Sequence, residues 1–214
     1  MRICYLFNSS TPSSNPSSIQ VANTCGAIAE LSHNIKLIVP NTGLNISLKK
    51  FYGIKKSPKL IKLKYFTKFP LGYNYYLFSI FSVLYGMLNR TELYITRNFF
   101  SLFLLCVLKK KVIIEVHHDL KNEGRIVNLL YKYLKIFNNK NIIKIVAITT
   151  PVKKYLTKVF NVDPKKIEII SSASGLKFKF NKIKKKKKYN IGYFGSLDTS
   201  KGSKFLIKLA NIDK

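Results

Sequence analysis

The fold class is decided by residues 2–40, which read RICYLFNSSTPSSNPSSIQVANTCGAIAELSHNIKLIVP. The apolar run at residues 2–7 predicts a short buried strand, which ends in a loop rich in Ser and Pro. The amphipathic stretch at residues 19–31 predicts a helix, capped by one of the two serines directly before it. Residues 35–39 predict a second buried strand. This order of strand, loop, helix and strand is typical of a parallel α/β sheet.

The same alternation of apolar strands and helices continues along the chain, after an irregular connection at residues 41–58. Further strands are predicted at residues 60–66, 93–96, 112–116, 142–148 and 167–170. Helices are predicted at residues 73–88, 99–108 and 126–137, and another begins near Pro151. The sequence therefore predicts a Rossmann-like α/β fold, in which helices flank a parallel sheet.

Two domains of unequal size are predicted from this pattern. Residues 1–175 form one complete α/β domain, and residues 176–188 form a lysine-rich linker that ends in five consecutive lysines. Residues 189–214 begin again with a strand, a turn and a helix. Because a single unit of this kind cannot bury its own faces, we expect it to be the start of a second domain and the chain to be incomplete.

The chain is strongly basic, with 38 Lys and Arg against 9 Asp and Glu and a formal net charge of +29. Such a charge suits a polyanionic partner, either nucleic acid or an anionic membrane. The basic residues are scattered, however, and the sequence is also rich in Asn, Ile, Phe and Tyr, which AT-rich codons encode along with Lys. The distribution favours a coding bias over a dedicated nucleic-acid interface.

The cysteines and the apolar stretches bear on the compartment. The chain has three cysteines, Cys4, Cys25 and Cys106. Their spacing fits neither a metal site nor a disulfide framework, which favours the reducing cytoplasm, and residues 3–7 are too short for a signal peptide. The apolar stretches at residues 73–88 and 99–108 fall short of the roughly 20 residues that cross a bilayer. They predict buried helices or, as the alternative, a helix face that rests on a membrane.

Several motifs that hold phosphates, metals or nucleophiles are absent from the sequence. It contains no G-x-x-x-x-G-K-[ST] loop and no G-x-G-x-x-G fingerprint, so neither a P-loop nor a standard dinucleotide site is predicted. It also lacks the D-x-D metal clamp and the G-x-S-x-G nucleophile turn. We therefore expect no metal and no cofactor.

His117 and His118 directly follow the strand predicted at residues 112–116. Ligands of open parallel sheets bind beyond the carboxyl ends of the strands, and histidine can hydrogen-bond a sugar hydroxyl or move a proton near neutral pH. Adjacent side chains diverge from a strand, so the pair makes a poor metal site. The alternative is a pair of ordinary loop histidines.

Residues 192–202, which read GYFGSLDTSKG, lie between a predicted strand and a predicted helix. Glycines let a phosphate approach the backbone, and a helix N-terminus supplies free amide donors and a positive dipole. Lys201 adds positive charge beside them. The stretch therefore predicts a phosphate-binding loop, with an ordinary surface turn as the alternative.

Several separated stretches resemble, in order, glycosyltransferase family four. Residues 94–98, YITRN, and residues 111–120, KVIIEVHHDL, are similar to the Y-x-R-N and E-x-H-D region of that family. Residues 145–156 and 163–170 resemble its next two segments, and residues 192–202 resemble its Y-x-G-R-L-x-x-x-K-G donor-phosphate loop. The resemblance covers nearly the whole chain.

The resemblance implies a retaining glycosyltransferase of the GT-B architecture, with two facing Rossmann-like domains and no requirement for a metal or cofactor. It places His117, with His118 as the second choice, in the catalytic site against the donor sugar. It assigns the donor phosphates to Gly195, Ser196, Lys201 and Gly202. Ser196 stands where the family has an arginine, and a serine cannot make the bidentate, charge-assisted contact of that arginine.

These expectations combine into one hypothesis, with two alternatives. The chain is the acceptor-side domain of a hexosyltransferase that builds cell-surface polysaccharide from a nucleotide-sugar donor and a glycan or lipid-linked acceptor, and it is inactive alone. It works in the cytoplasm, where its basic surface can hold it on the inner face of the membrane. The alternatives are a nucleotide-sugar epimerase-like enzyme of the same architecture and a non-catalytic basic protein that binds nucleic acid or anionic membrane.

Overall fold

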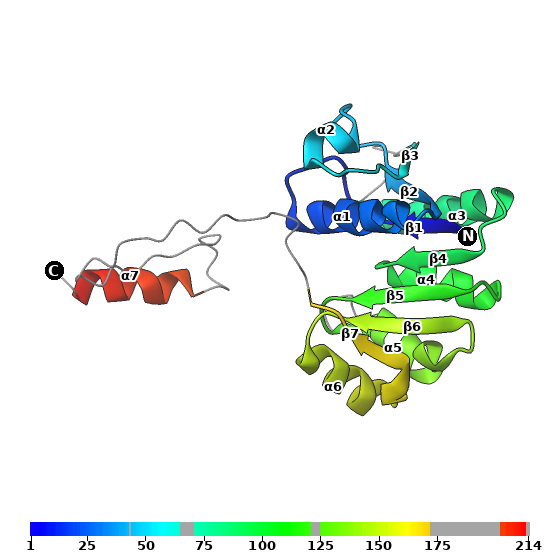
Figure 1. Ribbon diagram of the computed structural model, residues 1–214. Coiled ribbons are helices and arrows are strands. Elements are labelled where there is room, and N and C mark those ends of the chain that lie inside the picture. The colour runs from blue at the N-terminus through cyan, green and yellow to red at the C-terminus, as the bar shows by residue number, and fades with distance from the viewer. Residues whose placement is uncertain (43, 65–70, 121–124, 172–201, 213–214) are drawn as a thin grey trace. The chain divides into compact units, whose positions relative to one another are not determined.

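A computed structural model of the chain describes residues 1–42, 44–64, 71–120, 125–171 and 202–212 (Figure 1). The chain divides into two compact units, Met1–Gly175 and Leu176–Lys214. In the first unit the described strands form one seven-stranded sheet, in the order β3-β2-β1-β4-β5-β6-β7, and every neighbouring pair is parallel. The predicted parallel α/β sheet is therefore confirmed.

The elements alternate along the chain as the apolar pattern predicts. The strands are β1 (Arg2–Leu6), β2 (Asn34–Pro40), β3 (Lys59–Leu63), β4 (Leu93–Thr96), β5 (Val112–Val116), β6 (Ile142–Ala147) and β7 (Ile167–Ile169). The helices of the first unit are α1 (Pro16–Glu30), α2 (Leu48–Tyr52), α3 (Leu71–Leu88), α4 (Phe99–Val107), α5 (Arg125–Tyr133) and α6 (Thr150–Phe160), with short 3-10 turns at η2 (Ile136–Asn138) and η3 (Pro164–Lys166).

The second unit is described only at α7 (Ser203–Ile212) and the residue before it. The linker at residues 176–188, the strand at residues 190–194 and most of the phosphate loop lie outside the described residues. The domain boundaries at residues 175 and 189 therefore stay a prediction.

Side chains of the strands alternate between two cores, one on each face of the sheet. On one face, Ile3 and Tyr5 of β1 pack in a cluster with Val21 and Cys25 of α1. On the other face, Leu6 of β1 belongs to a cluster with residues of α3, α4 and α6. Successive residues of a strand point to opposite faces, and burial on both faces explains why the central strands are apolar throughout.

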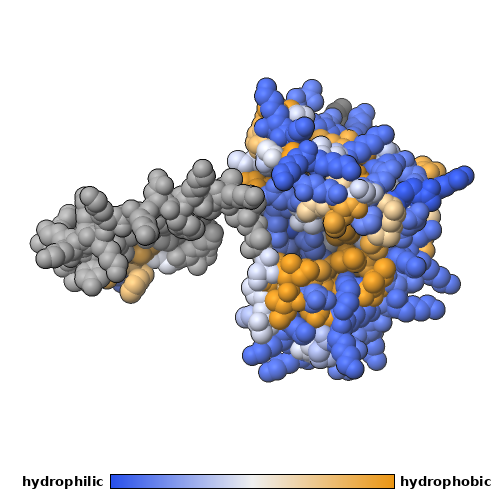
Figure 2. All heavy atoms as spheres, in the orientation of Figure 1, coloured by the Kyte–Doolittle hydropathy of each residue, from blue (hydrophilic) through white to orange (hydrophobic). Residues whose placement is uncertain are grey.

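The sheet is not covered equally on its two faces. Figure 1 shows no described helix in front of β5 and β6 on the face that carries α1. Figure 2, in the same orientation, shows an apolar patch where Figure 1 draws β5 and β6, and hydrophilic side chains border it. Ile143 of β6 is 46% exposed. In the described part of the chain, this region of the sheet is therefore open to solvent.

Three local predictions are wrong. The first helix begins at Pro16 after Asn15, not at the two serines predicted as its cap, because proline suits the first helical turn. The connection at residues 41–58 is not irregular throughout, since α2 lies within it and the Ser47 side chain accepts a hydrogen bond from Lys50 N. The helix predicted at residues 126–137 ends at Tyr133, because Lys135 adopts a left-handed conformation with φ +46°.

Gly86 of α3 lies against the ring of Tyr94, and this contact leads to a stability prediction. A Cβ atom built at Gly86 would lie 2.5 Å from Cε1 of Tyr94, whose side chain is fully buried. We expect Gly86→Ala to lower the free energy of unfolding by about 1–3 kcal/mol, because the ring cannot move out of the packed core. Urea unfolding followed by circular dichroism measures the change.

Gly72 provides the matched control for Gly86, because it lies in the same helix and a Cβ there would meet nothing within 4 Å. Gly72→Ala is expected to leave the stability unchanged or to raise it by up to roughly 1 kcal/mol, through the higher helix propensity of Ala. Equal effects of the two substitutions would contradict the close packing of α3 on β4.

Candidate functional site

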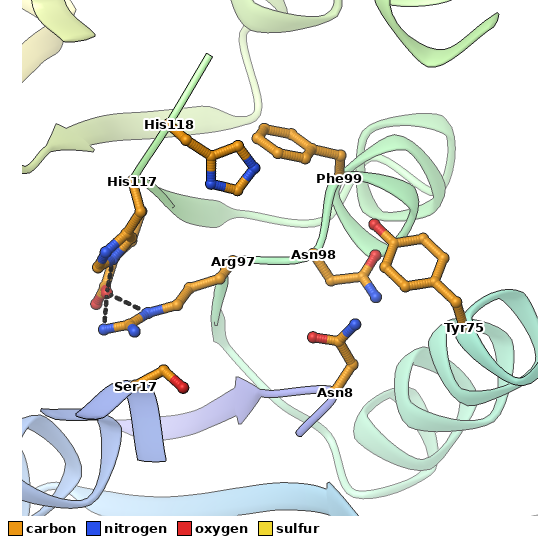
Figure 3. Close-up of a pocket in the computed structure, with 9 residues that line it drawn as sticks. Asn8, Ser17, Tyr75, Arg97, Asn98, Phe99, His117 and His118 are labelled. Carbon is orange, nitrogen blue, oxygen red and sulfur yellow. Dashed lines mark hydrogen bonds and ion pairs between the residues drawn. The ribbon is translucent and has the colours of Figure 1, made fainter. Parts of the chain in front are cut away.

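The strand order reverses at β1, and this places a pocket at one edge of the sheet. From β1 the chain proceeds through β2 and β3 on one side, and it then returns to build β4 to β7 on the other side. Open parallel sheets bind ligands beyond the carboxyl ends of the strands at such a switch point. A pocket of about 250 Å³ lies at that place. Its lining consists of Asn8, Ser17, Tyr75, Arg97, Asn98, Phe99, Glu115, His117 and His118 (Figure 3).

A buried ion pair crosses from the end of β4 to β5 in the wall of this pocket. Nη2 of Arg97 lies 2.7 Å from Oε2 of Glu115, and the two side chains are only 10% and 11% exposed. Nε of Arg97 donates to the same carboxylate oxygen at 2.8 Å and to the hydroxyl of Tyr5 at 2.9 Å. The guanidinium also lies over the ring of Phe7. These contacts fix both charges beside the pocket.

Glu115 is ionised in this environment. Burial raises the pKa of its carboxyl, but the hydrogen bond from His117 and the charge and hydrogen bond of Arg97 outweigh burial and hold the pKa below its usual value. Burial, together with the charge of Glu115, raises the pKa of the Tyr5 hydroxyl well above its usual value. Tyr5 therefore stays protonated, and the wall of the pocket presents one carboxylate and one guanidinium.

Both histidines predicted from the sequence line the pocket, in different surroundings (Figure 3). Nε2 of His117 lies 3.5 Å from Oε2 of Glu115, and its side chain is 22% exposed. The ring of His118 is exposed and lies edge-to-face against Phe99, with centroids 6.3 Å apart. The carboxylate of Glu115 holds the ring of His117 in place at the pocket surface. Of the two, His117 is therefore the better placed to donate a hydrogen bond or a proton into the pocket.

Asn98 brings an unsatisfied donor to the pocket. It is the N-cap of α4, where its Oδ1 accepts a hydrogen bond from Ser101 N at 2.9 Å. Its Nδ2 is buried without a hydrogen-bond partner among the described residues, although the whole residue is only 2% exposed. Figure 3 shows its amide group directed toward the interior of the pocket. A buried donor of this kind is satisfied by a ligand oxygen or by water.

Sequence reasoning missed most of the pocket. Arg97, Asn98 and Glu115 lie within the stretches that resemble glycosyltransferase family four, yet they were not predicted as site residues. The available signal was a polar or charged side chain at the end of an apolar strand. Tyr75 carried no such signal, because it lies within a mostly apolar helix and not at the end of a strand.

The predicted phosphate loop lies outside the described residues except for Gly202, and phosphate binding by this loop stays a prediction. Gly195, Ser196 and Lys201 lie outside the described residues. Gly202 is described: its φ is +78°, and its carbonyl accepts hydrogen bonds from the amides of Phe205 and Leu206 at the start of α7. Within the described ranges, no three His, Cys, Asp or Glu side chains lie close enough together to hold a metal ion.

The lowered pKa of Glu115 predicts how stability depends on pH. A carboxyl whose pKa is lowered by folding stabilises the protein fully above the pKa of the unfolded chain, which is about 4.3 for Glu. That stabilisation is lost as the pH falls through the folded-state pKa. We therefore expect Glu115→Gln to lower the free energy of unfolding by roughly 3 kcal/mol at neutral pH, because it leaves Arg97 without its counter-charge. The difference in stability between this variant and wild type should close below about pH 4.

Urea unfolding of both proteins across the acid range measures this gap. Glu92→Gln is the control, since Glu92 pairs with Arg2 at the surface, where both side chains are about half exposed. A gap for Glu115→Gln that is as large at low pH as at neutral pH would mean that Glu115 is not ionised in the folded protein.

Comparison with known proteins shows a likeness in structure alone. No family model matches the sequence, and no curated protein matches it. The fold is similar to that of a glycosyltransferase from Rickettsia africae, with a TM-score of 0.52 and 15% identity over 79% of this chain and 42% of that chain. It is also similar to Anabaena HepE, crystallised in complex with UDP and glucose, with a TM-score of 0.53 and 10% identity over 81% and 45% of the two chains.

A third similar structure is an enzyme of another kind. The UDP-GlcNAc 2-epimerase from Methanocaldococcus jannaschii matches with a TM-score of 0.54 and 12% identity, over 79% of this chain and 45% of that chain. The chain therefore has the Rossmann-like fold of one half of a GT-B enzyme. It spans less than half the length of each of these three proteins.

Proposed function

We propose that the chain is the acceptor-side half of a glycosyltransferase that moves a hexosyl group from a nucleotide sugar to a glycan or lipid-linked acceptor, with retention, in the synthesis of cell-surface polysaccharide. The observation that carries this proposal is the pocket at the switch point of the sheet. There a histidine lies beside a buried pair of a carboxylate and a guanidinium, and a buried amide donor without a partner among the described residues lines the same pocket. Sugars present many hydroxyl groups, and such a set of donors and acceptors suits them.

His117 has the central role in the proposed reaction. Its imidazole lies at the pocket surface while Glu115 holds it from behind, so it can donate a hydrogen bond to a hydroxyl of the donor sugar. The donor phosphates would be held by the loop that contains Ser196 and Lys201 and ends at Gly202. The enzyme would act in the cytoplasm, and no metal takes part.

A transfer assay tests the proposal. The chain is incubated alone, and joined to a complete donor-binding half, with labelled UDP-, GDP- and dTDP-hexoses and with lipid or glycan acceptors. We expect labelled acceptor and free nucleoside diphosphate only from the joined protein, and a product with the anomeric configuration of the donor. Transfer by the chain alone would contradict its assignment as one half of the enzyme.

The same assay separates the proposal from its alternatives. An epimerase of this fold would convert the sugar of a nucleotide sugar without any acceptor, and the similarity to the UDP-GlcNAc 2-epimerase makes this the second candidate. DNA binding that depends on salt, together with a melting temperature that nucleotide sugars do not change, would instead favour a basic binding protein.

A further inference from the structure

Helix α3 buries polar residues, while many of its large apolar residues are exposed. Asn74, Ser79 and Ser82 are at most 5% exposed, and the two serine hydroxyls donate to carbonyls of their own helix. Six large apolar side chains of the same helix are between 38% and 83% exposed: Tyr73, Tyr76, Ile80, Phe81, Leu84 and Leu88. Soluble proteins rarely expose a contiguous apolar surface of this kind without a partner.

Helix α4 continues this surface. The ring of Tyr76 lies edge-to-face on Phe100 at 4.8 Å, and Phe100 stacks on Phe103 at 6.1 Å. One turn further along α4, Val107 is 61% exposed. We refer to the six exposed residues of α3 together with Phe100, Phe103 and Val107 as the α3–α4 face.

Cations lie at one end of the α3–α4 face, and its helices carry no acid. None of the residues of α3 and α4 is charged. Arg90 follows the end of α3, and Lys109, Lys110 and Lys111 follow α4. Glu92 is the acid nearest in sequence to Arg90, and it is paired with Arg2. An apolar surface with a cationic end matches the lipid–water boundary of an anionic membrane, where acyl chains meet negative headgroups.

We propose that the α3–α4 face docks on an anionic phospholipid surface. None of the helices in the described ranges is long and apolar enough to cross a membrane, so the contact is one of a helix face lying in the interface. A second copy of the chain fits this face less well, because each copy carries a formal charge of +29 and would bring like charges together.

One end of the α3–α4 face adjoins the pocket. Tyr75 lines the pocket, and its ring lies 5.5 Å from that of Tyr76. If the proposed transferase function holds, a lipid-linked acceptor in the membrane would therefore present its head group beside the pocket. The docking itself does not depend on that function, and the two can fail separately.

Sedimentation with vesicles tests the docking. The full chain is mixed with vesicles of phosphatidylglycerol and phosphatidylcholine in equal parts, or of phosphatidylcholine alone. We expect binding to the mixed vesicles only, and we expect Phe81→Ser with Leu84→Ser to weaken it by about tenfold or more through lost apolar burial. The control variant is Leu31→Ser with Leu44→Ser. Both leucines are exposed and lie away from this face, so the control variant should bind vesicles as wild type does.

The cationic end is tested in the same way. Replacing Lys109, Lys110 and Lys111 by Gln should also weaken binding about tenfold at low salt. The charge-matched control replaces three exposed lysines on and near α2, on the other side of the sheet: Lys49, Lys50 and Lys56. Circular dichroism melting confirms that each variant folds.

Three results would overturn the docking proposal. The first is that the variants of the α3–α4 face and its cationic end weaken vesicle binding no more than their controls do. The second is equal binding to vesicles with and without phosphatidylglycerol. The third is a wild-type protein that does not bind vesicles but forms a dimer in analytical ultracentrifugation, when the Phe81 and Leu84 variant is monomeric. This result would make a second copy the partner of the α3–α4 face.

Discussion

His117→Ala is expected to lower kcat for sugar transfer by roughly 100-fold or more, because it removes the pocket's best-placed proton and hydrogen-bond donor. Its side chain is only partly buried and contacts the carboxylate of Glu115 at 3.5 Å, so the fold should tolerate the change. The rate is measured on the chain joined to a complete donor-binding half, with the unfolding midpoint recorded alongside.

Two further variants make the His117 prediction specific. His33→Ala is the matched control, since His33 lies in the turn before β2, away from the pocket, and it should leave the rate unchanged. His117→Gln keeps a hydrogen-bond donor but cannot carry a proton. Partial activity of this variant would indicate a hydrogen bond to the sugar, whereas activity as low as that of His117→Ala would indicate proton transfer. If His117→Ala transfers sugar at the wild-type rate, His117 has no role in the reaction.

Arg97→Ala is expected to lower the free energy of unfolding by about 3–5 kcal/mol, since it leaves the buried carboxylate of Glu115 without its counter-charge. Both side chains are about 90% buried, so solvent screens this pair little. The Tyr5 hydroxyl would also lose the hydrogen bond from Arg97 Nε. Urea unfolding at neutral pH measures the loss.

The control for Arg97→Ala is Arg2→Ala, which breaks the ion pair with Glu92 at the surface. That pair has a similar N···O distance, 3.1 Å, but its side chains are about half exposed, so a far smaller change is expected. Replacing Arg97 and Glu115 together by Leu should recover much of the loss, because no unpaired charge is then buried. Equal losses from Arg97→Ala and Arg2→Ala would contradict the buried pair.

The strands could be predicted from the sequence because central parallel strands are buried on both faces and are therefore continuous apolar runs. The predictions for β4 and β5 match the structure residue for residue. The wrong helix predictions have local causes that the hydrophobic pattern of the sequence does not show. Lys135 ends α5 through its backbone conformation, and α2 is only five residues long, too short to show a helical period.

The candidate site was predictable only in part, for a similar reason. His117 and His118 were conspicuous because the chain has just three histidines. Arg97 is one cation among 38, and nothing local to it shows that it is buried. Its pairing with Glu115 requires β4 and β5 to be neighbours in the sheet, and that neighbourhood becomes evident only once the strand order is known.

The proposed function requires the pocket at the carboxyl ends of β1, β4 and β5 to bind a sugar. The most direct test is a nuclear magnetic resonance titration of the isotope-labelled chain with UDP-glucose and with methyl glucosides, up to about 10 mM, where a binding free energy of roughly 3 kcal/mol is still detected. We expect shifts of the amide signals of Asn8, Asn98 and His117, and unchanged signals in α6. Shifts confined to other parts of the chain, or no shifts at all, would contradict sugar binding in this pocket.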